Sequence, residues 1–155
     1  MSKIPSDSFA FALRWLRLIS VMSAGFCFGM IFFNGLDPWH ALDQLIWTEL
    51  YGKPEIPETA VPAYRLIFRL FCLLSLFTFF LLYQITDHPL KNRESWAFTA
   101  VWITGLGWPL GSAAIALFCG AYSYLLSSAM TGLLFLPPLL LLIPHFRKNR
   151  TDFQA

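Results

Sequence analysis

The chain has 155 residues, of which 57% are hydrophobic and only 13% are charged, and its mean hydropathy is +0.58. This composition excludes an ordinary water-soluble domain, in which about 25% of residues are charged. The formal net charge of +2 is dispersed along the chain, which excludes nucleic-acid binding through a clustered basic face. The protein is therefore predicted to reside in a lipid bilayer.

Four apolar stretches are each long enough to cross a bilayer, which takes about 20 residues. The predicted spans cover residues 12–36, 62–86, 96–119 and 124–146. No charged residue or histidine lies between Ser95 and Pro144, and one helix of that length would measure roughly 75 Å, so the chain must fold back between Gly120 and Ser128. The pattern predicts an all-α fold, a single transmembrane domain built as a four-helix bundle.

A more polar segment separates the first two spans. Asp37 and Pro38 form a typical helix start, and Gly52 is a natural stop. We therefore expect a short amphipathic helix over residues 38–51 that lies on the membrane surface.

Lysine and arginine residues concentrate on one side of this layout. Eight of the eleven lie in the amino terminus, the loop between the second and third spans, and the carboxy tail. The other three are Lys53, Arg65 and Arg69. Because cytoplasmic loops carry the excess of positive charge, both termini are predicted to be cytoplasmic, in a bacterial inner membrane.

Arg65 and Arg69 stand four residues apart at the start of the second span, and so on one helix face. A guanidinium there needs a partner or water. The two could face a cavity and hold an anionic or carbonyl-bearing ligand. They could instead snorkel or pair with acids of the surface segment, Asp37, Asp43 or Glu49, and we favour this anchoring interpretation because ionisable groups at helix ends often serve it.

His40 and Asp43, three residues apart on the surface helix, are further candidate ligand-binding residues. Two such donors without a third do not define a metal site. His88 and His145 lie near span ends, so a buried haem is not predicted. The three cysteines lie within apolar stretches and are interpreted as packing residues, so that no cofactor or metal is expected.

Two pairs of glycines repeat at a spacing of four residues, Gly25 with Gly29 and Gly107 with Gly111. Small residues at this spacing let membrane helices approach closely. They would serve packing inside the bundle or, alternatively, a homo-oligomer or the docking of a membrane-protein partner.

Prolines interrupt the last two spans at Pro109 and at Pro137–Pro138. Each removes a helical hydrogen bond and frees a backbone carbonyl. The freed carbonyls are expected near Gly105, Leu133 and Leu134. Beside Thr104 or Thr131 they could line a small cavity or coordinate a cation, although such prolines more often only shape packing. No span carries an acid at its middle, which argues against active transport.

With this layout the chain resembles small four-helix bacterial membrane proteins of the DoxX-like kind. The resemblance lies in the segment LDPWHALDQLIW after the first span and in AYRLIFRLF at the start of the second. It implies that Arg65 and Arg69 face a pocket. Such proteins are mostly of unassigned function, and a few act as quinone-linked oxidoreductase subunits.

The sequence contains no GxSxG, HExxH, Walker or dinucleotide-binding pattern, so no enzyme class is supported. The leading hypothesis is an interaction or accessory subunit of a membrane complex. The alternative is a binder of a lipid, quinone or similar amphiphile, which could be redox-linked, using Arg65 and Arg69. A third is an immunity-type protein that blocks a toxin at the outer face.

Overall fold

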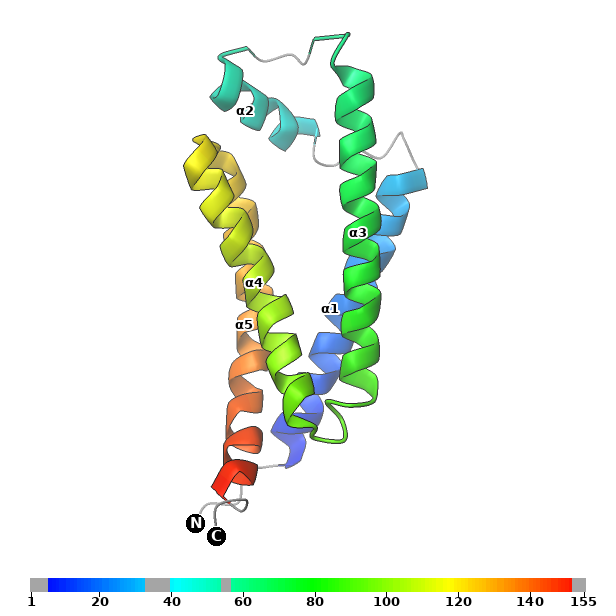
Figure 1. Cartoon of the computed structure of the whole chain (residues 1–155), viewed down its shortest axis with the longest axis vertical. Coiled ribbons are helices and arrows are strands. Elements are labelled where there is room, and N and C mark those ends of the chain that lie inside the picture. Colours follow the sequence, from blue (N-terminus) through cyan, green and yellow to red (C-terminus); the bar gives the residue numbers. More distant parts are fainter. Residues whose placement is uncertain (1–5, 33–39, 54–56, 152–155) are drawn as a thin grey trace.

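The computed structural model describes residues 6–32, 40–53 and 57–151, with side chains for residues 7–32, 44–53 and 57–146. The described part contains five helices: α1 (Ser6–Phe32), α2 (His40–Tyr51), α3 (Val61–Asp87), α4 (Ser95–Cys119) and α5 (Tyr122–Thr151). The all-α fold with a short helix between the first two long ones is confirmed (Figure 1). The predicted start of that short helix at residues 38–39 lies outside the described residues, as do positions 33–36 of the first predicted span.

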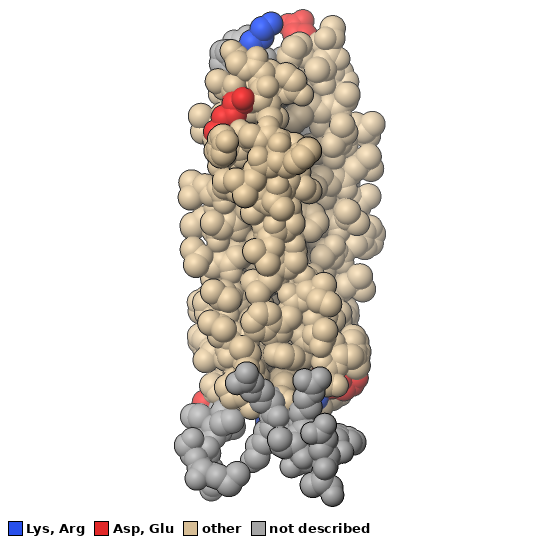
Figure 2. All heavy atoms as spheres, turned by 60° about the vertical axis from the view of Figure 1, so that its left-hand side comes forward, with Lys and Arg blue, Asp and Glu red and all other residues tan. Residues whose placement is uncertain are grey.

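The four long helices, α1, α3, α4 and α5, are each long and apolar enough to cross a membrane. Figure 2 shows charged side chains near the two ends of the visible face and none across its middle. Side chains that face lipid need no polar coat, so large apolar residues on this surface are expected. The molecule is an integral membrane protein of four spans.

The ends of the long helices differ from the predicted limits. α1 begins at Ser6, ahead of position 12, and α5 continues to Thr151, beyond position 146. The fold-back between α4 and α5 needs only Gly120 and Ala121. Gly120 has a positive φ of 78°, and the amide of Ala121 donates to the carbonyl of Ala116 at 2.9 Å. This compact helix end requires the left-handed backbone that glycine adopts without strain.

The long helices form two pairs, α1 with α3 and α4 with α5. The pairs converge at the end that holds the turn of residues 88–94 and diverge toward the end crossed by α2 (Figure 1). We call the end at which the pairs converge the closed end, and the end at which they diverge the α2 end. At the closed end α1 also packs on α5, whereas α3 and α4 touch little along their length. The buried core lies at the closed end: Phe9, Ala12, Leu13, Leu16, Leu82, Leu90, Ala97, Val101, Phe135, Leu139 and Leu142.

Polar contacts reinforce the closed end. Arg17 of α1 pairs with Asp87 of α3 at 2.8 Å. On the other side of α1, the Ser8 hydroxyl and the His145 ring form a hydrogen bond of 3.1 Å. The Arg93 guanidinium lies 5.0 Å from the centre of the Phe9 ring, a cation–π contact that joins the α3–α4 turn to α1. Together these contacts tie three helices and the turn at one end.

One carbonyl freed by a proline is used in packing. Pro138 has no N–H for the carbonyl of Leu134, the residue four positions earlier. The indole N–H of Trp15 donates to that carbonyl at 3.2 Å. The expected free carbonyl near Leu134 is therefore satisfied by α1, which links the proline interruption to the contact between α1 and α5.

Candidate functional site

A cavity of about 390 Å³ lies between α3 and α4, near the α2 end of the molecule. Its walls are mainly apolar, and α4 supplies most of them. The lining consists of Phe71, Gly107, Trp108, Gly111, Ser112, Ile115 and Tyr124. Because the lining helices are membrane spans, this cavity is placed to receive an apolar group from the bilayer.

A smaller crevice of about 20 Å³ lies farther from the α2 end, between α3, α4 and α5. Trp108 borders both spaces. Four hydroxyl residues contribute to its walls: Ser75, Thr78, Thr104 and Thr131. Both spaces therefore have mainly apolar walls, and four hydroxyl-bearing residues are among those that line the inner one.

The predicted packing glycines do not lie at close helix contacts within the described chain. A Cβ atom at Gly25, Gly29 or Gly111 would meet no atom within 4 Å, and one at Gly107 would meet only Ile103 of the same helix at 3.9 Å. On α4, Gly107 and Gly111 instead border the larger cavity. Their lack of side chains helps to create that space.

Other glycines make the close contacts. A Cβ at Gly105 would lie 3.2 Å from Phe135 and 3.3 Å from Leu139 on α5. Gly105 belongs to a buried stripe of α4 with one member every four residues, Ala97, Val101, Gly105 and Pro109. That regular stripe is the sequence signal that could have identified Gly105.

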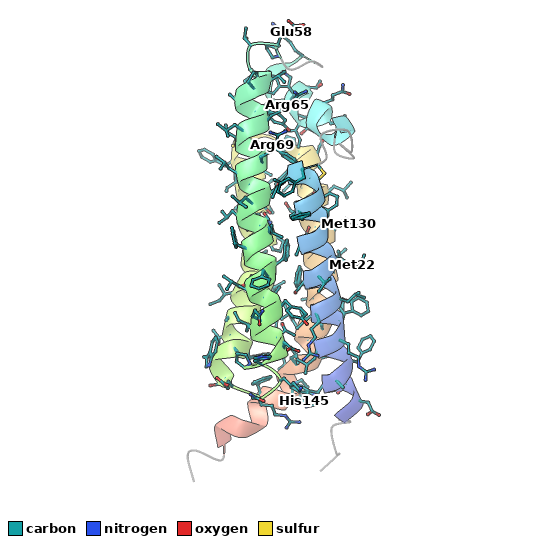
Figure 3. All side chains as sticks on the ribbon, turned by 90° about the vertical axis from the view of Figure 1, so that its right-hand side faces the viewer. Met22, Glu58, Arg65, Arg69, Met130 and His145 are labelled. Atoms are coloured by element: carbon teal, nitrogen blue, oxygen red, sulfur yellow. The ribbon has the colours of Figure 1, made fainter. Side chains whose placement is uncertain are left out.

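Arg65 and Arg69 lie on α3 near the α2 end, and both are exposed. Figure 3 shows them on the flank of α3 that faces α2. Helical spacing puts them on the same face as Cys72, which is buried. Neither residue lines the two cavities. They therefore lie on α3 outside the lining of both the larger cavity and the crevice. Their ligand-binding role stays a prediction. We refer to the larger cavity and the crevice together as the opening.

His40 and Asp43 belong to α2, but their side chains lie outside the described part of the chain. Their suggested ligand-binding role therefore stays a prediction. Within the described residues, no three His, Cys, Asp or Glu side chains group closely enough to hold a metal ion.

Glu49 fixes α2 to the first turn of α5. Its carboxylate accepts hydrogen bonds from the Ser123 amide at 3.0 Å and from the Ser123 hydroxyl at 2.6 Å. A carboxylate at a helix amino terminus is favoured because amides there lack helical partners. The hydroxyl bond, followed by the amide bond, holds the pKa of Glu49 below its ordinary value of 4.5. This contact holds α2 at the end where the α1–α3 pair and the α4–α5 pair diverge (Figure 1).

Acid is expected to release α2 from α5. Because the pKa of Glu49 is lowered on docking, the contact is fully present above pH 4.5 and is lost as pH falls through the lowered pKa. Pulsed EPR between spin labels on the exposed residues Leu45 and Phe118, in a cysteine-free background, should show a narrow distance distribution at pH 7. Glu49→Gln should broaden it already at pH 7, whereas Glu58→Gln should not. A narrow distribution in Glu49→Gln would contradict this role.

The fold and the site define a class, the polytopic membrane proteins of four spans with an opening between two helix pairs. No protein-family model matches this chain, and no curated protein or solved structure matches it. No family is therefore assigned, and what the structure supports is a small membrane protein of four spans.

Proposed function

We propose that the protein binds a bilayer amphiphile, a lipid, quinone or similar molecule, in the opening between α3 and α4. The observation that carries this proposal is the apolar cavity of about 390 Å³ between membrane spans. Small-molecule pockets typically measure about 300–1,000 Å³. A single turn of a partner helix, about 10 Å wide and 5.4 Å long, would already fill roughly 420 Å³, so the volume favours a chain-like ligand.

The two arginines suit the polar end of such a ligand. They stand near the α2 end of α3, at the level of the cavity residue Phe71. Arg69 and Phe71 point to opposite sides of the helix, because two positions correspond to about 200° of rotation, so the polar part of the ligand must reach around α3 to meet the guanidinium groups. Guanidinium groups bind carboxylate and phosphate oxygens in a bidentate manner. In this proposal the apolar part lies against Trp108 and Ile115, while Arg65 and Arg69 contact the polar part.

Filling the cavity should abolish binding without harming the fold. Gly111→Leu introduces a side chain into the cavity, and its Cβ meets no atom within 4 Å. Gly25→Leu is the matched control, because its Cβ is equally unobstructed and lies outside the cavity lining. Native mass spectrometry in mild detergent should find a retained amphiphile on the wild type and on Gly25→Leu, and at least tenfold less on Gly111→Leu. Equal retention by all three proteins would refute the proposal.

A specific observation also favours an interaction or accessory subunit. Gly25 and Gly29 of α1 have open space in front of them, so a second membrane helix can approach there closely. In this candidate function Gly25→Leu would abolish a protein complex, detected by cross-linking in native membranes, while the retained amphiphile is unaffected. The same two variants therefore separate the two functions.

A further inference from the structure

Ser75 carries a buried hydroxyl that is not satisfied by its own helix. Serine and threonine side chains in a helix commonly donate to the carbonyl four residues earlier. Ser20, Thr78 and Thr86 do so, at 2.7, 2.9 and 2.8 Å. Ser75 is only 5% exposed, and its Oγ has no hydrogen-bond partner among the described residues. A buried hydroxyl without a partner costs about 1–3 kcal/mol, so a ligand that satisfies it gains affinity.

A backbone acceptor lies on the opposite wall of the same crevice. Pro109 cannot donate the helical hydrogen bond that the Gly105 carbonyl would normally receive. Both Gly105 and Ser75 line the crevice. Ser75 of α3 and Gly105 of α4 thus border the same crevice, and the Gly105 carbonyl has lost its helical donor.

The size and charge of the crevice limit what it can hold. Its volume of about 20 Å³ exceeds the roughly 10–15 Å³ that one water-sized group needs. No charged residue is among its lining residues, and a charge at this depth in a membrane would be costly. Trp108 borders both spaces, so a group in the crevice is adjacent to the larger cavity.

We infer that the crevice binds the neutral hydroxyl of a long-chain lipid alcohol, whose chain occupies the larger cavity. A hydroxyl both accepts and donates hydrogen bonds, so it can accept one from the Ser75 hydroxyl and donate one to a backbone carbonyl such as that of Gly105. This inference rests on the cavity of the proposed function, but it places the polar contact of the ligand at Ser75 instead of at Arg65 and Arg69. Ser75 lies six residues beyond Arg69, about 9 Å along the helix axis, so the hydroxyl is recognised at a different level from the arginines.

Three probes with the same chain length test this inference: 1-hexadecanol, hexadecane and hexadecanoate. Each is added to the purified full-length protein in mild detergent, and bound probe is quantified by native mass spectrometry. The wild type should retain hexadecanol about fivefold to tenfold better than hexadecane, as expected for one hydrogen bond made in a buried site. Ser75→Ala should lose this preference. It should fold normally, because it removes a hydroxyl that has no partner in the described chain.

Ser20→Ala is the matched control, since the Ser20 hydroxyl is also buried but already bonded to Leu16. It should keep the preference for hexadecanol. If Ser75→Ala keeps the preference as well, or if the wild type retains both probes equally, the inference fails while the proposed function stands. A preference for hexadecanoate that is lost in Arg65→Gln/Arg69→Gln and unchanged in Ser75→Ala would place recognition at the arginines and would also overturn it. If no probe is retained, the inference fails, and the amphiphile retained by the wild type and by Gly111→Leu decides separately whether the proposed function stands.

Discussion

Replacing Leu139 with alanine is expected to lower the free energy of unfolding by about 2 kcal/mol or more. Leu139 is fully buried in the core at the closed end, and its side chain packs against Gly105 of α4. In a membrane the transfer contribution is small, because lipid also surrounds the side chain in the unfolded state. The remaining loss comes from the cavity left between α4 and α5. Reversible unfolding in detergent, followed by circular dichroism, measures this change.

The neighbouring residue provides the control for this substitution. Leu140 is 50% exposed on the lipid-facing surface, so Leu140→Ala leaves no internal cavity. We expect its effect to stay within about 0.5 kcal/mol. Equal destabilisation by the two substitutions would show that the core at the closed end does not determine stability.

Gly105→Leu is expected to separate α4 from α5 and to lower the free energy of unfolding by about 1–3 kcal/mol or more. Even the first added atom, Cβ, would lie 3.2 Å from Phe135 and 3.3 Å from Leu139. The rest of the leucine has no space between these two buried side chains. The unfolding measurement used for Leu139→Ala checks this prediction.

Gly111→Leu lies on the same helix and provides the comparison for Gly105→Leu. Its Cβ has open space, so the substitution should be neutral or slightly stabilising through better helix propensity. If Gly105→Leu were as stable as Gly111→Leu, the close approach of α4 to α5 would not need a glycine.

The spans follow from the sequence because the bilayer imposes a simple length rule. The uncharged stretch from Ser95 to Pro144 cannot be one helix, and Gly120 is the residue best suited to end the first half. The extra turn at the start of α1 was harder to predict. Phe9 is buried only because α5 and the α3–α4 turn pack around it, and this tertiary environment leaves no local signal.

The site was less predictable than the spans. Glycine spacing predicts a helix-packing role for Gly107 and Gly111, which stays a prediction for an oligomer or a partner. Spacing does not reveal which face of α4 meets α5, and Gly105 makes that contact. The contact between Glu49 and Ser123 joins residues that are 74 positions apart. Ser75 is a single serine in an apolar stretch, and only the arrangement of three helices around it leaves its hydroxyl without a partner among the described residues.

The divergence of the two helix pairs has a consequence for the response of the protein to membrane thickness. A helix of 27 residues such as α3 measures about 40 Å, whereas a typical hydrocarbon core is about 30 Å thick, so such helices tilt. Because the pairs lean apart from a common closed end, their tilt and the width of the gap between α3 and α4 change together. We therefore expect a thinner bilayer to widen the gap and a thicker one to narrow it.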